Sequence, residues 1–473
     1  MRIHLIGVCG TAMGTLAAML KRQGHEVSGS DEHVYPPMSD FLRAEGIELL
    51  EGYQAAHVAG ALDLVVVGNA VSRGNPELEA MLDRKQRYCS LPEAVRDFFL
   101  WRRRSIVIAG THGKTTTTAL AAWLLVHGGL DPSVLVGGIA RNFGDDGASY
   151  RIGDGQAFVI EGDEYDSAYF DKTAKFLKYL PDIAVINNIE FDHADIYANL
   201  DEVRLAFRRF VNLVPRSGLT LIGVDSPDAA SLVRLSPSRV ETFGLSEAAD
   251  WRAHDLTVEN AAAETSATEP ARTRFRVARR RDDLGWFTVA LVGAHNVRNA
   301  LAALAVGVDQ GVPLERLRTG LEAFLGVKRR LEIVGARRGV TIYDDFAHHP
   351  TAVAETLRAV RAARPGRRLW AIFEPRSASS CRRVFQDDFA QAFSAADRVV
   401  IASVFRSALP EHERLSVAQL VSDLTAAGVA AFHEPDVDAI VRVVAGEAQA
   451  GDLVVIMSNG GFGGIHRRLL EAL

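Results

Sequence analysis

The chain of 473 residues contains only three cysteines, Cys9, Cys89 and Cys381. They lie far apart in the sequence, and no two of them form a C-x-x-C pair. An odd number of scattered thiols excludes a disulfide framework. It is typical of a reduced, cytoplasmic protein that buries its cysteines.

Long apolar runs, a signal segment and an excess of positive charge are missing as well. No hydrophobic run approaches the ~18 residues of a membrane-spanning helix, and residues 2–6 read as a strand without the apolar core of a signal peptide. Lys and Arg number 53 against 59 Asp and Glu, so the net charge is −6 and the pI about 6.2. We expect a cytoplasmic protein that binds neither membranes nor nucleic acids, while phosphorylated small molecules stay compatible with this charge.

Length and hydropathy pattern predict three α/β domains. The chain is too long for one hydrophobic core, and 48% hydrophobic with 24% charged residues is a globular composition. Strand-like runs alternate with helical patterns, which favours parallel sheets. We predict a Rossmann-like domain over 1–103, a phosphate-loop, ATPase-like domain with a mixed sheet over 104–326, and a second Rossmann-like domain over 327–473.

A glycine turn at residues 7–14 separates the strand 2–6 from a predicted helix over 16–23. Its glycines are spaced G-x-x-G-x-x-x-G, which differs from the G-x-G-x-x-G of dinucleotide-binding dehydrogenases and argues against that class. An anion could sit on the helix start beside Gly10 and Thr11. A tight strand–helix turn without any ligand is an equally simple interpretation.

Polar residues also follow the next two predicted strands of this domain. The strand 26–31 ends in Ser30 and Asp31, and Asp31 could meet a ribose or a base. Asn69 follows the strand 62–67 at the same carboxyl edge, where parallel sheets bind their ligands.

The second domain opens with a candidate phosphate loop. The apolar strand 106–108 runs into a glycine turn and then into a helix start, where backbone N–H groups and the helix dipole favour an anion. A lysine there can cross the β- and γ-phosphates of a nucleotide while a threonine hydroxyl holds magnesium. Ile108 stands where the usual motif has its first glycine, so an ordinary strand–turn–helix is the alternative. The loop residues are Gly110, Thr111, His112, Gly113, Lys114, Thr115 and Thr116.

Acidic residues and a histidine follow two further strands of this domain. Glu161 and Glu164 come after the strand 156–160, and His193 follows the strand 182–186. Parallel strands bring these side chains to the edge that holds the phosphate loop, and carboxylate oxygens suit Mg²⁺. His193 could be a metal ligand, a proton carrier or the cap of the helix that follows.

The end of the second domain changes its pattern. Residues 251–292 alternate with period 2, which predicts antiparallel strands at a sheet edge, and 261–271 read as a hairpin loop. Asn296 and Asn299 then open a helix and lie three residues apart, hence on one face. They could cap the helix or contact a purine.

The third domain again alternates strands and helices. Strands are predicted at 340–343, 369–373, 398–402 and 452–457. The final glycine cluster opens a helix over 465–473 and could be a second anion cradle or a plain tight turn.

Five motifs in this order resemble those of the Mur ligases of bacterial peptidoglycan synthesis, and the resemblance covers the whole chain. They are Gly110-Thr-His-Gly-Lys-Thr-Thr116, Glu161-x-x-Glu164, Asn188-Ile-Glu-Phe-Asp-His193, His295-Asn-x-x-Asn299-Ala and Asp345-Phe-Ala-His-His-Pro350.

The resemblance implies an ATP-dependent ligase in which the first domain binds the UDP of a sugar nucleotide, the second binds ATP and the third binds the incoming peptide. ATP would phosphorylate the carboxylate of UDP-N-acetylmuramate, and an amine would then displace the phosphate. The stretches 29–38, 68–76, 161–166 and 457–466 favour the branch that adds the tripeptide L-alanyl-γ-D-glutamyl-meso-diaminopimelate in peptidoglycan recycling. The alternative is the branch that adds L-alanine. A nucleotide-gated binding module without catalysis would have lost the acidic and histidine clusters, which are present.

The resemblance also assigns roles to individual residues. Lys114 would span the β/γ-phosphates, Thr115 with Glu161 or Glu164 would hold one Mg²⁺, and His193 would serve a second; Lys114, Glu164 and His193 are the catalytic candidates. The other nucleotide contacts would be Asn296 and Asn299 at the adenine, with Arg329, Asp345 and His348 closing from the third domain. The sugar nucleotide would meet Gly10, Thr11, Ser30, Asp31, Asn69 and His112. Candidates for the peptide are Arg376, Ser377, Ser379, Arg382, Arg406 and Asn459.

One position departs from the family pattern. Several Mur ligases carry a carbamylated lysine on the helix after the Asp-His motif, but residues 200–214 contain arginines and no lysine. We predict that this chain forms no carbamate at its metal site. We also expect a monomer or a weak homodimer.

Overall fold

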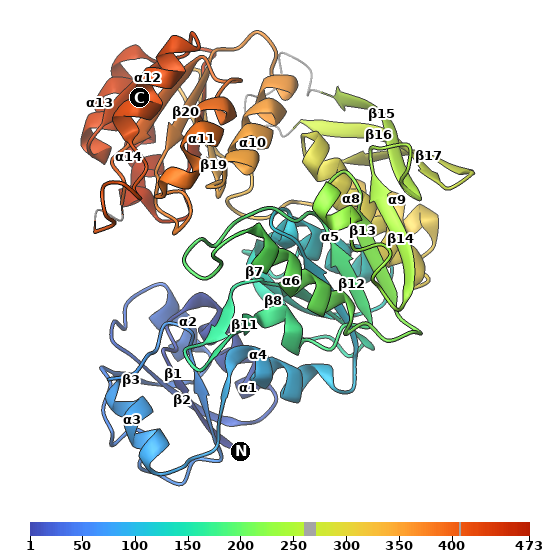
Figure 1. Ribbon diagram of the computed structural model, residues 1–473, viewed down its shortest axis with the longest axis vertical. Coiled ribbons are helices and arrows are strands. Elements are labelled where there is room, and N and C mark those ends of the chain that lie inside the picture. The colour runs from blue at the N-terminus through green and yellow to red at the C-terminus, as the bar shows by residue number, and fades with distance from the viewer. Residues whose placement is uncertain (260–270, 406–407) are drawn as a thin grey trace.

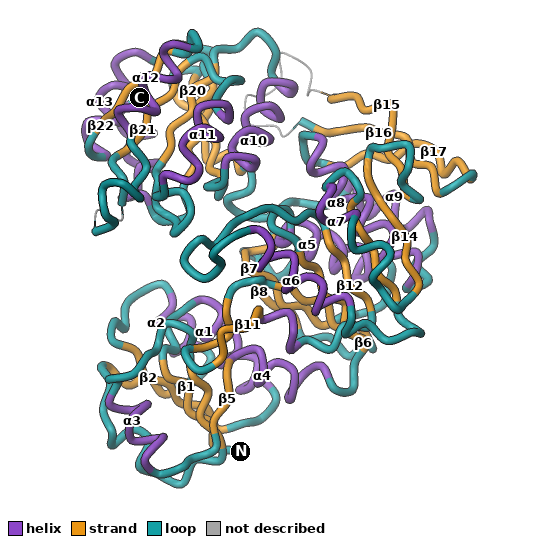
Figure 2. The backbone as a smooth tube through the Cα atoms, in the orientation of Figure 1, coloured by secondary structure: helices purple, strands orange, loops and turns teal. Residues whose placement is uncertain are grey.

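A computed structural model describes residues 1–259, 271–405 and 408–473. Three α/β units follow one another along the chain, with the N-terminal and C-terminal units on either side of the middle one (Figure 1). In each unit the strands run through the interior and helices cover the sheet (Figure 2). The predicted fold class is confirmed, and the prediction of a loop at 261–271 falls on residues that lie almost wholly outside the described part. The division at 103/104 and 326/327 stays a prediction.

The N-terminal unit is built on a five-stranded parallel sheet in the order β3-β2-β1-β4-β5. Its central strand β1 is buried except for Arg2, and the neighbouring strand β4 is apolar and fully buried, as expected for strands covered on both faces. The strands are β1 Arg2–Ile6, β2 Glu26–Asp31, β3 Glu48–Glu51, β4 Leu64–Val67 and β5 Tyr88–Ser90, and the helices are α1 Thr11–Arg22, α2 Met38–Ala44, α3 Pro76–Asp83, α4 Leu91–Val95 and η1 Arg96–Leu100.

The middle unit has a ten-stranded mixed sheet in the order β17-β16-β15-β14-β13-β12-β6-β9-β7-β8. Its parallel centre ends in the antiparallel strands β15, β16 and β17, which confirms the prediction for residues 251–292. The strands of this sheet are β6 Arg104–Ala109, β7 Ser133–Ala140, β8 Ala148–Arg151, β9 Ala157–Gly162, β12 Ile183–Ile186, β13 Leu219–Gly223, β14 Arg239–Gly244, β15 Trp251–Glu259, β16 Arg272–Arg279 and β17 Asp282–Val289. A separate antiparallel pair is formed by β10 Asp166–Ala168 and β11 Asp171–Ala174. The helices are α5 Lys114–His127, η2 Lys175–Lys178, α6 Leu200–Val211, α7 Pro227–Ala230, α8 Ala294–Asp309 and α9 Leu314–Glu322.

The C-terminal unit has six strands in the order β18-β19-β23-β20-β21-β22, all parallel except the edge strand β18. The strands are β18 Glu332–Arg337, β19 Val340–Asp345, β20 Leu369–Phe373, β21 Arg398–Ala402, β22 Ala430–Glu434 and β23 Leu453–Met457. The helices are α10 Pro350–Ala363, η3 Arg383–Phe385, α11 Gln386–Ala392, α12 Val417–Ala426, α13 Val437–Glu447, η4 Phe462–Gly464 and α14 Ile465–Ala472.

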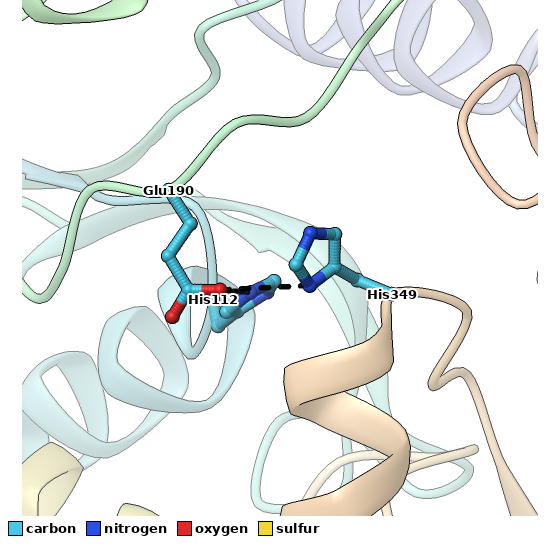
Figure 3. A group of neighbouring side chains, drawn as sticks. All are labelled: His112, Glu190 and His349. Carbon is cyan, nitrogen blue, oxygen red and sulfur yellow. Dashed lines mark hydrogen bonds and ion pairs between the residues drawn. The ribbon is translucent and has the colours of Figure 1, made fainter. Parts of the chain in front are cut away.

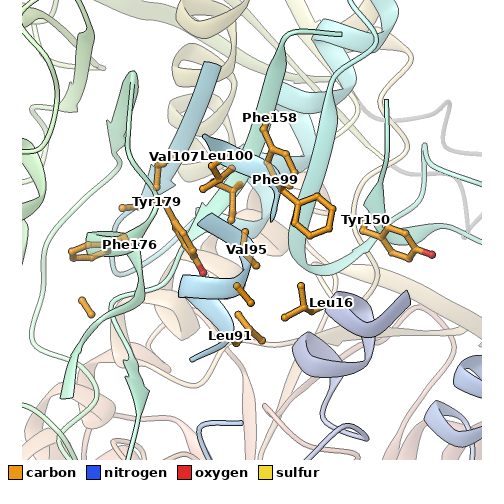
Figure 4. Close-up of a cluster of buried hydrophobic side chains, with 14 of the residues drawn as sticks. Leu16, Leu91, Val95, Phe99, Leu100, Val107, Tyr150, Phe158, Phe176 and Tyr179 are labelled. Atoms are coloured by element: carbon orange, nitrogen blue, oxygen red, sulfur yellow. The ribbon is translucent and has the colours of Figure 1, made fainter. Parts of the chain in front are cut away.

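One hydrophobic core crosses from the N-terminal unit into the middle unit. Leu16 of α1 and Leu91 of α4 belong to the same buried cluster as Val107, Phe158 and Phe176 of the middle sheet and its surroundings (Figure 4). Burying shared apolar surface fixes two units against each other. The cavity described next is lined by residues of the middle and C-terminal units.

Candidate functional site

A cavity of about 600 Å³ lies between the middle and C-terminal units. Its floor is the phosphate loop, 111–116, and one wall is the segment 187–193 that follows β12. The start of α8, at 295–299, forms another wall, and residues 345–349 cover it from the C-terminal unit. Four segments distant in the sequence thus meet at the carboxyl edge of the middle sheet, where open α/β sheets bind ligands.

The backbone of the phosphate loop requires its two glycines. Gly110 has φ 134° and Gly113 has φ 78°, both in the region that side chains disfavour. A Cβ on Gly110 would lie 3.0 Å from the backbone nitrogen of Asn187. The segment after β12, which neighbours β6 in the sheet, also fixes the loop, because the backbone N–H of His112 donates to Oδ1 of Asn188 at 2.7 Å.

Lys114 lies at the centre of the loop. Its Nζ donates to the carbonyl oxygen of Gly110 at 2.7 Å and lies 2.8 Å from Oε2 of Glu164. Burial by itself lowers the pKa of Lys114, but the charges of Glu164, Asp163 and Glu161 outweigh it and raise the pKa. The side chain is therefore a largely buried cation at neutral pH, at the place where a bound phosphate needs one.

The predicted metal residues surround this lysine. Ligand atoms of Glu164 and His193 lie within 4.8 Å of each other and of Asp163, which was not predicted as a metal ligand. Next to them, Glu161 accepts a hydrogen bond from Thr115 Oγ1 at 3.0 Å, and burial raises the pKa of this carboxyl. Carboxylates beside a hydroxyl suit Mg²⁺, and a buried carboxyl with a raised pKa gains from a nearby cation, so the donor set fits that ion.

His193 is held in a turn and is not a helix cap. It has φ 53°, an unusual value for a residue other than glycine, and α6 starts later with Asn199 as its N-cap. Burial lowers its pKa, but the hydrogen bond to Glu164 at 3.1 Å and the charges of Glu164 and Asp192 outweigh it and raise the pKa to about 9. Without a metal, His193 is thus an imidazolium that pairs with Glu164.

The two asparagines of α8 both line the cavity, on one face of the helix. Asn299 Nδ2 donates to Oδ1 of Asn296 at 3.1 Å, and Asn296 Nδ2 donates to the carbonyl oxygen of Val292 at 2.8 Å. Gly293 is the N-cap and has no side chain, so neither asparagine caps this helix. A Cβ at Gly113 would lie 2.4 Å from Asn299 Oδ1, so the helix start packs directly against the phosphate loop.

The C-terminal unit brings Asp345 and His348 to the cavity but turns Arg329 away from it. Arg329 donates to the carbonyl oxygens of Ser458 and Gly460, at 2.7 and 2.8 Å, inside its own unit. The cavity is lined by its neighbour Arg330, which sequence reasoning missed although it belongs to the same basic run. Its guanidinium donates to Thr115 Oγ1 at 3.1 Å.

The predicted sugar-nucleotide residues of the N-terminal unit occupy different environments. Gly10 and Thr11 stand where α1 begins, and Asp31 accepts a hydrogen bond from the backbone N–H of Cys9 at 2.8 Å. Asp31 therefore shapes the glycine turn. Asn69 Nδ2 donates across the unit boundary to Oδ1 of Asp166 at 2.9 Å.

Ser30 is fully buried and faces the interior, away from the ligand edge predicted for it. Its hydroxyl donates to the buried carboxylate of Glu77 at 2.5 Å, which also lies 3.2 Å from His4 Nε2 and 2.6 Å from His57 Nδ1. Burial by itself raises the pKa of Glu77, but hydrogen bonds to His4, Ser30 and His57 outweigh it and lower the pKa. Glu77 thus ties β1, β2 and the loop before β4 together.

The lowered pKa of Glu77 predicts an acid-sensitive contribution to stability. The contribution is complete above the unfolded-state pKa of about 4.3 and is lost as the pH falls through the lower folded-state value. We expect Glu77→Gln to lower the free energy of unfolding by about 1–3 kcal/mol at pH 7, because buried donors lose their charged acceptor. Urea unfolding of both proteins should show this gap shrinking below a pH of about 4; a gap independent of pH would contradict the prediction.

The predicted peptide residues lie outside the cavity lining. Arg376 stacks on Phe405, with its guanidinium carbon 3.7 Å from the ring centre, and Ser377 Oγ donates to Ser380 Oγ at 2.8 Å. Ser379 instead donates to Asp192 of the middle unit at 2.5 Å. Asn459 Oδ1 is buried without a hydrogen-bond partner among the described residues. Arg382 pairs with Glu413, and Arg406 lies outside the described residues.

Comparison with protein families matches all three units. Residues 2–101 match the Mur ligase family catalytic domain, 108–307 the Mur ligase middle domain, and 329–460 the Mur ligase glutamate ligase domain. A protein of Escherichia coli K12 is 40% identical over 100% of this chain and 98% of its own length. The chain belongs to the Mur ligase family.

The similar proteins are named for two branches of the Mur ligase family. The Escherichia coli relative is named UDP-N-acetylmuramate–L-alanyl-gamma-D-glutamyl-meso-2,6-diaminoheptandioate ligase. The crystal structure of a murein peptide ligase from Psychrobacter arcticus superposes with a TM-score of 0.71 at 37% identity, covering 100% of this chain and 98% of that one. A UDP-N-acetylmuramate–L-alanine ligase of Desulfatibacillum aliphaticivorans is 35% identical over 97% and 95% of the two chains.

These comparisons confirm the predicted family and a ligase activity for this Mur ligase.

Among the described residues, none of the helices combines the length and the apolar character that crossing a bilayer requires. Helix α6, which contains no lysine, carries Arg204, and this arginine pairs with Asp228 at 2.6 Å. The absence of a carbamate stays a prediction.

Proposed function

We propose that this Mur ligase uses ATP to join the amino group of L-alanyl-γ-D-glutamyl-meso-diaminopimelate to UDP-N-acetylmuramate, in the recycling of peptidoglycan. The observation that carries the proposal is the contact of Lys114, at the floor of a cavity shared by two units, with the cluster of Asp163, Glu164 and His193. The full-length identity of 40% to a relative named for this tripeptide supports the acceptor. Because a relative named for L-alanine is 35% identical to this chain, L-alanine is the alternative acceptor of the muramoyl group.

ATP would lie with its phosphates over residues 111–116 and its base near Asn296 and Asn299, which face the same cavity. Lys114 would leave the carbonyl of Gly110 and neutralise the β- and γ-phosphates. When bound, Mg²⁺ would neutralise further phosphate charge. Thr115 with Glu161 or Glu164 would hold one ion, and His193, after losing its proton, a second.

The muramoyl carboxylate would attack the γ-phosphorus, so that an O–P bond forms, the bond to the bridging oxygen of ADP breaks and an acyl phosphate results. The amine would then attack the acyl carbon, losing a proton as inorganic phosphate leaves with the former carboxylate oxygen. Arg330 and Asp345 come from the C-terminal unit, so closing that unit on the middle one completes the site and excludes water.

This order of bonds can be followed with oxygen isotopes. UDP-N-acetylmuramate labelled with ¹⁸O in its carboxylate should transfer one labelled oxygen to each inorganic phosphate, detected by mass spectrometry during turnover with ATP and the tripeptide. Unlabelled phosphate at full product yield would rule out the acyl phosphate.

Asn69 tests the assignment of the N-terminal unit to the sugar nucleotide. Its Oδ1 is buried without a hydrogen-bond partner among the described residues, while Asp166 fixes its amide group. We expect Asn69→Ala to raise KM for UDP-N-acetylmuramate roughly tenfold, or about 1.4 kcal/mol, and to leave KM for ATP unchanged. Initial rates against each substrate separate the two constants. An equal rise in both would place Asn69 outside a sugar-nucleotide site.

The three free cysteines are consistent with a reduced compartment, and we propose the cytoplasm. We expect the enzyme to work as a monomer or a weak homodimer.

A further inference from the structure

A second cluster of ligand-type side chains lies in the wall between the middle and C-terminal units, apart from the one that pairs with Lys114. It consists of His112 on the phosphate loop, Glu190 after β12 and His349 at the N-cap of α10, which point toward one another (Figure 3). Oε2 of Glu190 lies 3.3 Å from Nε2 of His112 and 3.6 Å from Nδ1 of His349. Two units of the fold therefore contribute to one group of three donor atoms.

Nδ1 of His349 faces both the start of α10 and the carboxylate of Glu190. Its Nε2 lies 3.1 Å from the carbonyl oxygen of Phe191, and because a carbonyl only accepts, Nε2 carries the proton. With the proton on Nε2, Nδ1 of the neutral ring carries the lone pair, as its hydrogen bond from a backbone N–H also requires. Nδ1 accepts a long hydrogen bond of 3.3 Å from the backbone N–H of Thr351, which a bound metal ion would replace.

The carboxylate opposite this lone pair is charged. An ionised carboxylate is the form that two neighbouring ring nitrogens and a hydroxyl donor stabilise, and Glu190 has all three within 3.6 Å. The Thr351 hydroxyl donates to the same Oε2 at 2.6 Å. An anionic oxygen thus lies 3.6 Å from a nitrogen lone pair, an arrangement that a cation between them would stabilise.

We propose that His112, Glu190 and His349 form a binding site for one divalent transition-metal ion of the zinc class. Two imidazole nitrogens and one carboxylate are ligands that Zn²⁺ and Co²⁺ prefer, whereas Mg²⁺ prefers oxygen. Ligands about 2.1 Å from a tetrahedral ion lie about 3.4 Å apart, close to the spacings of this cluster. The carbonyl of Phe191 holds the ring of His349 as second-shell carbonyls hold metal-bound imidazoles. His112 would then carry its proton on Nδ1.

A bound ion would tie the phosphate loop to α10. The effect of this link on turnover rests on the proposed function, in which the middle and C-terminal units must separate to release product. Zn²⁺ added to the enzyme with saturating Mg²⁺ and ATP should therefore lower turnover at least tenfold, and a chelator should restore it.

Co²⁺ binding to the full-length, untagged protein tests the site without using activity. We expect one equivalent of Co²⁺ to give the strong visible absorption of a four-coordinate ion, displaced by Zn²⁺ and not by Mg²⁺. Glu190→Gln and His349→Gln should each weaken binding 10–100-fold. His193→Gln, which removes a ligand of the other cluster, should bind Co²⁺ as the wild type does.

Several outcomes would overturn the site: no absorption in the wild type, unchanged affinity in Glu190→Gln or His349→Gln, or loss of binding in His193→Gln. Circular dichroism of each variant verifies folding, and the two glutamine variants act as independent checks on each other. If Zn²⁺ bound at this site without lowering turnover, the inference that the ion holds the middle and C-terminal units together would be wrong. Because Co²⁺ absorption needs no substrate, failure of the proposed reaction would leave this measurement intact.

Discussion

Replacing Lys114 by methionine is expected to lower kcat about 10³-fold or more while leaving the binding of UDP-N-acetylmuramate nearly unchanged. Nζ of Lys114 lies between the carbonyl of Gly110 and the carboxylate of Glu164, at the floor of the cavity. Methionine keeps the unbranched chain of lysine up to its last atom and removes the charge. Charge developing on transferred phosphoryl oxygens would then lose a preorganised partner, which costs about 4 kcal/mol.

Single-turnover release of ADP and calorimetric titration with UDP-N-acetylmuramate measure the two effects separately. Lys178→Met provides the matched control, because Lys178 pairs with Asp171 at 2.6 Å and does not line the cavity. Comparable losses of turnover and of sugar-nucleotide affinity would mean that the middle unit is not a separate ATP site. Retention of kcat within tenfold would remove Lys114 from phosphoryl transfer.

Glu164→Gln is expected to lower kcat about 10²–10³-fold and to raise the Mg²⁺ concentration needed for half-maximal activity. Glu164 is buried and pairs with both Lys114 and His193, at 2.8 and 3.1 Å. Glutamine keeps the volume but supplies one neutral oxygen. The loss of charge weakens a magnesium ligand and also removes the partner that keeps His193 protonated.

Activity against Mg²⁺ concentration distinguishes a metal ligand from a structural carboxylate. Glu241→Gln is the matched control: Glu241 is also buried in the middle unit, but it accepts a hydrogen bond from Trp251 Nε1 at 2.7 Å, away from the cavity. We expect Glu241→Gln to lower thermal stability while leaving the magnesium dependence as in the wild type. If Glu164→Gln lowered kcat without changing that dependence, Glu164 would not be a magnesium ligand.

The parallel sheets and the phosphate loop were predictable because both depend on local sequence. Buried strands of a parallel sheet are continuous apolar runs, as in β6 and β12, and the polar residues that follow them must meet at one edge. That rule alone brings Lys114, Glu164 and His193 together. The loop conformation itself follows from glycines at positions with positive φ.

Positions within loops and contacts between units could not be predicted in the same way. Arg329 and Arg330 are adjacent in a turn without periodicity, and Arg329 has φ 61°, so the sequence does not indicate which side chain enters the cavity. Ser30 faces inward because Glu77, which is 47 residues away, accepts its hydroxyl. The meeting of His112 with His349 depends on how two separately folded units pack, and local patterns contain no information about that.

The choice of acceptor tests the central claim most directly. Turnover of ATP with UDP-N-acetylmuramate should be measured with L-alanyl-γ-D-glutamyl-meso-diaminopimelate or with L-alanine as the amine, and each product should be identified by mass. The account predicts that the tripeptide supports phosphate release and forms UDP-N-acetylmuramoyl-tripeptide, with kcat/KM at least 10²-fold above that for L-alanine, or about 2.7 kcal/mol of discrimination. Phosphate release with L-alanine alone would contradict the account and identify the chain as an alanine-adding Mur ligase.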